Sequence, residues 1–318
     1  MIPCVLALAT LTLSACSSAA PTPEGGSSTV SGVAGGKGGV GGSGTASAPP
    51  SALTPEAYKA ELDGRRKPMA DAIDALAGAR GVKTLGQRVS KAEETLSGAA
   101  EELAALAPPD AVRAQHQQYV TSLQDFAAAL GSTGGKVGAR DLCSSSAVLT
   151  DLNDKLKALD EAGENLQRAG DYPADVVDVK AGRKQTRRLG NGSFVRKGSL
   201  GGRSSLEIDN GATRDAVVTV MRGGSKAFSV YVRRKATYKV KGVRDGTYKI
   251  YFTHGVDWDG KSKAFTRECS FERFQKSVTF KTTVTATQIR WHDWRVTLHA
   301  ISGGNARTSD VDPDSFPS

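Results

Sequence analysis

Residues 254–260 combine the side chains best suited to hold a small molecule or an ion. His254, Asp257, Trp258 and Asp259 all fall within this short stretch. A tryptophan ring can stack on a sugar while flanking carboxylates bind its hydroxyls, and the same carboxylates can supply half of a cation site. Because the stretch follows an alternating run at residues 247–252, we expect it on a loop, where binding residues concentrate. The competing structural interpretation is that Trp258 folds back as a plug on the end of a β domain.

Catalytic motifs do not support an enzyme. The sequence has no nucleophile elbow, no zinc-protease helix motif, no Ser-x-x-Lys set and no Cys–His arrangement. Asp257 and Glu268 are close enough in the chain to form a pair of carboxylates for glycoside cleavage. His116 stands alone on an apolar helical stripe, and His292 and His299 would lie about 23 Å apart on one strand. We therefore expect no cofactor and no metal.

The N-terminal region contains a candidate targeting signal. Leu13-Ser14-Ala15-Cys16 follows a short apolar run and precedes a stretch rich in glycine and serine. These four residues resemble the lipobox of bacterial lipoproteins, in which a signal peptidase cuts before the cysteine and the thiol receives diacylglycerol. The resemblance implies a signal peptide over residues 1–15 and a lipidated Cys16 at the start of a flexible tether, residues 16–53. The chain departs from the pattern in having no Lys or Arg in residues 1–4.

Lipidation at Cys16 would fix the compartment of the protein. Acyl chains such as palmitate hold a protein in a bilayer through hydrophobic burial, and more than one chain makes the anchor stable. The resemblance therefore implies attachment to the cell membrane, with the rest of the chain on its extracytoplasmic face.

The elements that would carry the candidate residues begin with a helical part. Over residues 54–170 the apolar side chains recur with helical spacing, most clearly at Val82, Leu85, Val89, Ala92, Leu96, Ala99, Leu103 and Leu106. This spacing is typical of helices that pack at a shallow angle. Four such stretches joined by short connections predict an antiparallel four-helix bundle, with His116 as a core residue.

A β domain is expected after a linker at residues 171–203. From residue 204 the apolar period changes to two, as in Phe228, Val230 and Val232, and about eight such runs predict an all-β sandwich over residues 204–302. Trp291 and Trp294 fit a cross-strand pair that closes a hairpin. Residues 303–318 are expected to be an acidic tail. The fold class is thus α+β, with two domains.

Two resemblances apply to the β domain. Residues 243–248 (VRDGTY) look like the turn-strand phrase of transthyretin-like sandwiches. The domain as a whole resembles uncharacterised β domains of secreted actinobacterial proteins. Neither resemblance implies an activity.

Charge divides the chain. Residues 1–170 carry 15 Lys and Arg against 18 Asp and Glu, whereas residues 171–318 carry 27 against 15. The linker contains a basic segment without acids, and its candidate polyanion contacts are Arg183, Lys184, Arg187, Arg188, Arg196 and Lys197. Glycines in the same segment predict an exposed loop. Such a loop is either a solvated linker or a contact for anionic wall polymers or membrane headgroups; we do not expect nucleic acid.

Cys143 and Cys269 would remain after cleavage before Cys16. In an oxidising compartment they can form a disulfide that ties the bundle to the sandwich. The alternative, two separate unpaired thiols in apolar surroundings, is the one that the sequence favours.

The sequence as a whole predicts a membrane-anchored lipoprotein. Its β-sandwich would bind an envelope polymer or a protein partner without catalysis, because no catalytic constellation is evident and its half of the chain is basic. One alternative is an envelope hydrolase that acts on glycan through loop carboxylates. The other is a purely structural or assembly lipoprotein.

Overall fold

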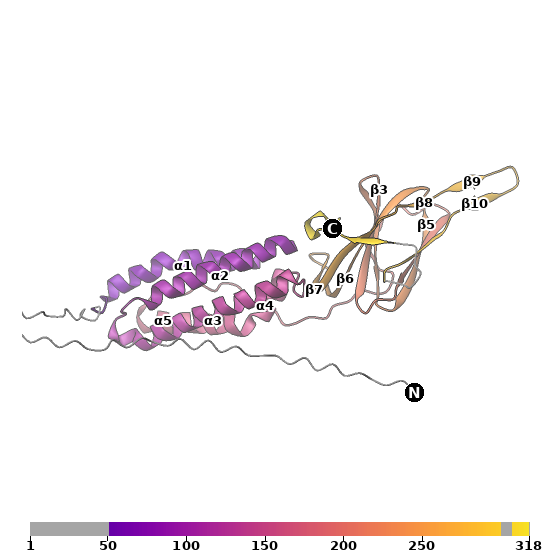
Figure 1. Ribbon diagram of the computed structural model, residues 1–318. Coiled ribbons are helices and arrows are strands. Elements are labelled where there is room, and N and C mark those ends of the chain that lie inside the picture. Colours follow the sequence, from indigo (N-terminus) through magenta and orange to yellow (C-terminus); the bar gives the residue numbers. More distant parts are fainter. Residues whose placement is uncertain (1–50, 300–306, 318) are drawn as a thin grey trace, which may run out of the picture. The chain divides into compact units, whose positions relative to one another are not determined.

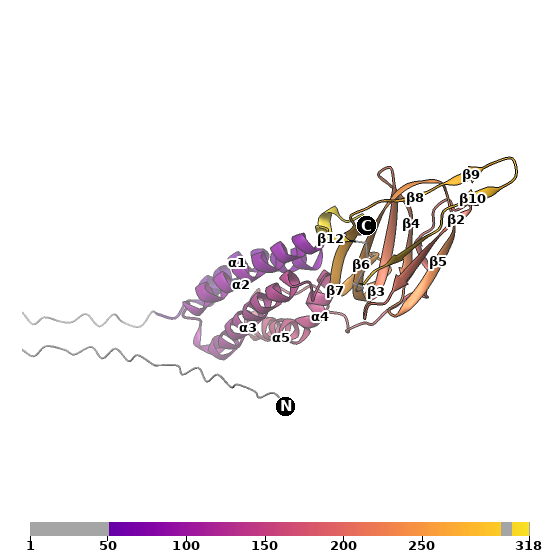
Figure 2. The ribbon, with the colours of Figure 1, turned by 45° about the vertical axis from the view of Figure 1, so that its right-hand side comes forward.

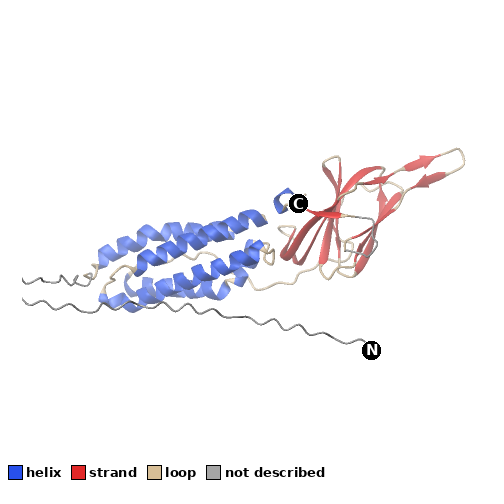
Figure 3. Cartoon of the chain, viewed as in Figure 1, coloured by secondary structure: helices blue, strands red, loops and turns tan. Residues whose placement is uncertain are grey.

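The chain has an α+β fold in which helices precede strands. The computed structural model describes residues 51–299 and 307–317, so the predicted signal peptide, Cys16 and most of the predicted tether lie outside the described residues. Helices come first, and a β-sandwich-like set of mainly antiparallel sheets follows (Figures 1 and 3). Within the described ranges, no helix has both the length and the apolar composition needed to cross a bilayer.

The helical part contains five α-helices. They are α1 (Pro55–Ala77), α2 (Val82–Ala104), α3 (Arg113–Gly138), α4 (Ser145–Asp151) and α5 (Asn153–Gly170), with a 3-10 turn η1 (Asp110–Val112) before α3. Thr54 caps α1, because its hydroxyl oxygen accepts a hydrogen bond from the Ala57 N–H at 3.2 Å. The predicted stripe on α2 is confirmed from Leu85 to Leu103, since all six of its residues in that range are buried.

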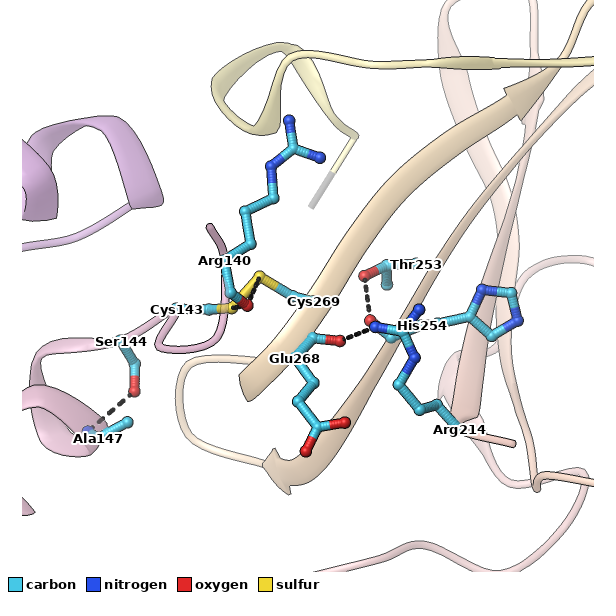
Figure 4. Close-up of a disulfide and its surroundings, with 9 residues drawn as sticks. All are labelled: Arg140, Cys143, Ser144, Ala147, Arg214, Thr253, His254, Glu268 and Cys269. Atoms are coloured by element: carbon cyan, nitrogen blue, oxygen red, sulfur yellow. Dashed lines mark hydrogen bonds between the residues drawn. A yellow bond between two sulfur atoms is a disulfide. The ribbon is translucent and has the colours of Figure 1, made fainter. Parts of the chain in front are cut away.

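The predicted fourth helix is two helices in the structure. Ser144 caps α4, accepting a hydrogen bond from the Ala147 N–H at 3.2 Å, so Leu142 lies before the helix rather than in it (Figure 4). At Leu152, with φ −91° and ψ 2°, the chain passes from α4 to α5. Asp151, Asn153 and Asp154 surround this break, and short polar side chains of this kind compete with helical hydrogen bonds.

His116 lies in the core of the helical part, as predicted. Its Nδ1 is 2.8 Å from the Tyr58 hydroxyl oxygen, and both residues are buried. Burial lowers the pKa of His116, although a backbone hydrogen bond with Leu103 opposes the shift. In the part of the chain that the structure describes, no group of three or more His, Cys, Asp or Glu side chains could hold a metal ion.

The predicted linker is exposed over residues 182–188, but its two ends are packed. Tyr172, Ala174 and Val176 are buried in the helical core, and β1 (Phe194–Arg196) forms within the range expected to be loop. Gly163 of α5 permits the close approach of Ala174, because a Cβ at residue 163 would lie 2.4 Å from the Ala174 carbonyl oxygen.

Twelve strands are present among the described residues. After β1 they are β2 (Ser204–Asn210), β3 (Asp215–Arg222), β4 (Ser225–Val232), β5 (Ala236–Val243), β6 (Gly246–Asp259), β7 (Ala264–Phe274), β8 (Val278–Phe280), β9 (Thr282–Val284), β10 (Ile289–Trp291), β11 (Trp294–Thr297) and β12 (Thr308–Asp310). The seven-stranded sheet has the order β1-β4-β3-β6-β7-β12, with β8 also paired to β6. A three-stranded sheet has the order β11-β2-β5, and β9 pairs only with β10 (Figure 2). Among the described strands, β11 and β2 are the one pair that runs parallel.

The seven-stranded sheet has two differently used faces. One face packs against the three-stranded sheet: Val218 and Val230 share a buried core with Ile208 and Val240. Side chains on the opposite face, which we call the outer face, form a second buried cluster of Val217, Tyr231, Trp258 and Phe265. The alternation of β-strand side chains puts neighbours such as Val217 and Val218 on opposite sides.

The C-terminal residues that the structure describes are not a free acidic tail. β12 extends the edge of the seven-stranded sheet by pairing with β7, and the 3-10 turn η2 (Pro313–Ser315) follows. Phe316 is buried, and its ring lies 5.3 Å from that of Phe271 and 6.0 Å from that of Tyr251.

The predicted pairing of Trp291 with Trp294 is wrong. Trp291 lies on β10, which pairs with β9, and Trp294 lies on β11, which pairs with β2. Asp293, between them, accepts a hydrogen bond from the Ser205 N–H at 2.6 Å. This contact draws the chain from the hairpin to the three-stranded sheet, so the two indoles belong to different ladders.

Cys143 and Cys269 form a disulfide, so the free-thiol interpretation is wrong (Figure 4). The segment after α3 lies along β7, where Cys143 N–H donates to the Thr266 carbonyl at 2.8 Å and Cys269 N–H donates to the Arg140 carbonyl at 3.0 Å. This pairing leaves the two Cα atoms 6.4 Å apart, within the range of a disulfide. The bond joins the helical part to the seven-stranded sheet.

We predict that the Cys143→Ser/Cys269→Ser variant loses about 3–5 kcal/mol of unfolding free energy, because the bond constrains the unfolded chain. The two cysteines are 126 residues apart in the sequence, which makes the constrained loop long. Urea unfolding of parent and variant, each without reductant, measures the difference. A loss below about 1 kcal/mol would show that the backbone pairing beside β7 maintains the unfolding free energy without the disulfide.

Candidate functional site

The segment predicted as a binding loop is the end of a strand. β6 runs through His254, Asp257 and Trp258, and its register with β7 shifts between His254 and Val256. At this bulge Asp257 adopts φ 60°, and a Cβ on Gly255 would lie 2.3 Å from the Cβ of Phe265. Bulges reverse the side-chain alternation. Trp258 therefore lies on the outer face instead of extending into solvent.

Trp258 is part of the outer-face cluster, close to the competing plug interpretation. Its ring meets those of Tyr231 and Phe265 edge to face, at centroid distances of 5.9 Å and 5.1 Å. Only 4% of the residue is exposed. The indole face that sugar stacking requires is covered by protein.

Asp257 is held by Arg187. The Arg187 side chain donates to both carboxylate oxygens through Nε at 2.9 Å and Nη2 at 2.8 Å, and its backbone N–H donates at 2.8 Å. Thr266 adds a hydroxyl donor at 2.7 Å. Burial alone would raise the pKa of Asp257, but these hydrogen bonds and the Arg187 charge outweigh it and hold the pKa at about 2. Asp259 also binds Arg187, at 3.1 Å.

Arg188 makes the equivalent contact with β3. Its Nε and Nη2 each lie 2.6 Å from a carboxylate oxygen of Asp215, which also accepts hydrogen bonds from Tyr231 and from the Arg234 N–H. Burial raises the pKa of Asp215, and these contacts reverse the shift to a net lowering. Arg187 and Arg188, predicted as polyanion contacts, are thus paired with buried carboxylates, although their side chains remain 43% and 36% exposed.

His254 is buried and does not face solvent. Its Nε2 lies 3.2 Å from Asn210 Oδ1. Burial is the main reason that the pKa of His254 falls from 6.5 to about 4, and the charges of Arg214 and His299 add to the effect (Figure 4). The role in ligand binding that we assigned to His254 from the sequence therefore has no exposed ring to act through in this structure.

A hollow lies on the outer face, close to Trp258. Its volume is about 190 Å³. The lining residues come from β1, β3, β4, β6, β7 and the C-terminal segment: Val195, Arg196, Val217, Thr219, Lys226, Ser229, Thr253, Trp258, Lys263, Ala264, Phe265, Phe271, Phe316 and Pro317. Arg196 is the one predicted polyanion contact among them.

The hollow is basic, and no Asp or Glu occurs among the described residues that line it. Arg196, Lys226 and Lys263 line it, and neither Arg196 nor Lys263 has an ion-pair partner among the residues that the structure describes. Burial lowers the pKa of Lys226, and the charges of Arg196 and Lys263 lower it further. Cations that repel one another become more stable when an anion binds between them.

Hydroxyl and aromatic groups complete the lining. Thr219 Oγ1 and Ser229 Oγ lie 3.0 Å apart and bind each other. Trp258, Phe265 and Phe271 add aromatic edges. The arrangement suits a ligand that carries a phosphate or carboxylate together with a ring or an alkyl group.

The other predicted contacts lie elsewhere. Arg183, Lys184 and Lys197 are exposed and do not line the hollow. Lys226 and Lys263 escaped the sequence reasoning because they stand beside turns, at residues 223–225 and 260–262, more than 25 residues from the basic segment. The only sequence signal for these two site residues was a lysine near each of two turns. That signal does not indicate that the turns lie close together in the fold.

Comparisons of the chain with protein-family models, curated proteins and solved structures found no match. The function of the site is therefore argued from its geometry.

We predict that lowering the pH from 7 to 5 removes about 2 kcal/mol of unfolding free energy through His254, because the unfolded state binds the proton that the folded state resists. The stabilisation by neutral His254 is complete above pH 6.5 and is lost as the pH falls toward about 4. Urea unfolding at both pH values measures it. His254→Gln, which stays neutral, should show a smaller loss; His116 has the same sign of shift and accounts for part of the remainder. Equal losses in parent and variant would contradict the assignment.

Proposed function

We propose that this protein is a lipid-anchored extracytoplasmic lipoprotein whose β part binds an anionic envelope polymer without catalysis. The observation that carries the proposal is the outer-face hollow, where Arg196, Lys226 and Lys263 gather around hydroxyl and aromatic groups, and where the described lining residues include no Asp or Glu. A polymer with regularly spaced phosphates or carboxylates is the ligand class that this arrangement favours, since each unit offers an anion beside a polyol or sugar ring.

The disulfide supports the proposed compartment. Cys143–Cys269 joins two parts of the chain that are distant in sequence, and such bonds persist where the surroundings are oxidising, as outside the bacterial cytoplasm. Cys16, as the acylated residue, would hold the chain at the bilayer, and the residues before 54 would serve as its tether. The helical part then acts as a spacer, a four-helix bundle in which α4 and α5 together take the place of the fourth helix.

The hydrolase alternative gains no support from the described residues. A glycosidase needs one carboxyl group that holds its proton near neutral pH. Asp257 has a pKa of about 2 and is surrounded by donors, so it stays ionised at neutral pH. Asp259 binds Arg187 and Ser262. The assembly alternative likewise rests on no specific contact.

The proposal predicts that Arg196→Ala/Lys263→Ala weakens binding of the full chain to poly(glycerol phosphate) about 30-fold, from about 1 kcal/mol for each cation near an anionic surface. Lys226 stays in place because it is half-buried. Calorimetry at about 50 mM and about 300 mM salt measures affinity and its salt dependence. Dextran, an uncharged polymer, should not bind.

Arg183→Ala/Lys184→Ala is the matched control, since it removes the same charge from exposed residues outside the hollow. It should weaken binding less than about threefold. If both double variants weaken binding equally, the charge acts without a site. If the parent fails to bind at low salt, the proposed polymer class is wrong.

The proposed anchor has its own test. Intact-mass measurement of the chain extracted from membranes should give a polypeptide that begins at Cys16 and carries acyl groups. Cys16→Ser should lose the acyl mass and should be released from membranes by a high-salt wash that leaves the parent bound, because the acyl chains supply the salt-resistant part of the membrane affinity. An uncleaved and unmodified N-terminus in the cytosol would overturn the proposed location.

A further inference from the structure

The exposed large apolar side chains of the described residues are confined to one short stretch. They are Val284 (70% exposed), Ile289 (43%), Trp291 (47%) and Trp294 (41%). All four lie within residues 284–294, on or directly after the hairpin formed by β9 and β10. Figures 1 and 2 show this hairpin extending away from the larger sheets. Clustered exposure of this kind marks an interaction surface, whereas single exposed apolar residues are ordinary.

The register of the hairpin places its apolar side chains together. Val284 is opposite Ile289, and Trp291 is opposite Thr282, with the pair Thr283 and Arg290 between them. Alternation therefore puts Val284, Ile289 and Trp291 on one face of the ribbon. The ladder contains no third strand. This apolar face thus has no covering sheet among the residues that the structure describes.

Polar contacts, rather than the apolar face, hold the base of the hairpin. Asp245 accepts hydrogen bonds from the Thr282 N–H at 2.7 Å and the Thr282 hydroxyl at 2.8 Å. His292 Nδ1 lies 3.2 Å from the Lys281 carbonyl oxygen, and the Trp294 indole N–H donates to the Thr279 carbonyl at 2.9 Å. None of these contacts uses Val284, Ile289 or Trp291, so these three exposed side chains can serve a contact outside the chain.

Charge identifies the kind of surface that this hairpin fits. Residues 282–289 contain no charged side chain, and Lys281 and Arg290 stand at either end of this stretch. The nearest acid, Asp293, is engaged with the Ser205 N–H. Alternation puts Lys281 and Arg290 on the ribbon face opposite Val284, Ile289 and Trp291. A ribbon with one apolar face, cations beside it and no free acid nearby matches an anionic bilayer, where tryptophan favours the interface and Lys and Arg meet the headgroups.

We propose that the β9–β10 hairpin inserts Val284, Ile289 and Trp291 into the interface of an anionic lipid bilayer, with Lys281 and Arg290 at the headgroups. None of these residues lines the outer-face hollow. The hairpin would form a second membrane contact that is independent of acylation at Cys16 and of polymer binding. The proposal for the hairpin and the proposal for polymer binding can therefore be tested independently.

The test uses the full chain with Cys16→Ser, so that no acyl chain contributes, and vesicles of phosphatidylcholine with or without phosphatidylglycerol. The chain has three tryptophans, and Trp258 is buried. Quenching by brominated lipid therefore reports Trp291 and Trp294 directly. We expect a blue shift and quenching with the anionic vesicles, and at least tenfold weaker partitioning to vesicles of phosphatidylcholine alone.

Two pairs of variants make the result specific. Ile289→Ser/Trp291→Ser should reduce partitioning at least tenfold, while near-ultraviolet circular dichroism checks that the β part stays folded. Lys281→Gln/Arg290→Gln should remove the preference for anionic lipid. Lys239→Gln/Lys241→Gln removes the same charge from exposed positions on β5 and should leave partitioning unchanged.

Several outcomes would overturn the proposal. One is a parent chain whose tryptophans are not quenched by any vesicle at low salt, and another is unaltered partitioning of Ile289→Ser/Trp291→Ser. Loss of partitioning in Arg196→Ala/Lys263→Ala would assign the membrane contact to the hollow instead. Self-association of the parent that Ile289→Ser/Trp291→Ser abolishes, measured by sedimentation, would assign the apolar face to a second copy of the chain.

Discussion

Two buried carboxylates at one end of the seven-stranded sheet, at the start of β3 and near the end of β6, determine the course of the chain between its helices and its strands. Asp215 and Asp257 are each about 6% exposed, and a buried carboxylate without a cation is strongly destabilising. The consecutive residues Arg187 and Arg188 satisfy both. The segment that carries them is therefore fixed against the sheet, although no helix or strand contains it.

The position of the candidate site follows from this constraint. After Arg188 the chain packs Leu189 against the outer-face cluster and pairs Ser193 with Tyr231, which leads directly into β1. Arg196, at the end of β1, is thereby placed at one wall of the hollow. Arg187 and Arg188 of the basic segment therefore position Arg196. The basic segment looks uniform in the sequence, but some of its cations pair with buried carboxylates and others are exposed and do not.

The structural features that depend on local residue spacing were predicted correctly from the sequence. The helical stripe on α2 and the core position of His116 agree with the structure, because each follows from spacing within a few turns. The α+β order of the chain also follows from the change of period near residue 204. These features need no knowledge of distant residues.

The predictions were wrong where contacts between residues far apart in the sequence determine the structure. The bulge at Gly255 depends on β7, and the roles of Arg187 and Arg188 depend on carboxylates 70 and 27 residues away. Cys143 meets Cys269 only because the end of α3 lies along β7. Lys226 and Lys263 likewise meet Arg196 through strand order. A single sequence contains no signal for such encounters.

The disulfide also has a topological consequence. Residues 143–269 form a covalently closed ring that includes α4, α5, the arginine segment and most of the seven-stranded sheet. The exposed stretch 182–188 lies inside this ring. A protease that cuts the backbone there would leave both fragments joined through sulfur. A nicked molecule outside the cell would keep its strands attached to its helices for as long as the surroundings remained free of reductant.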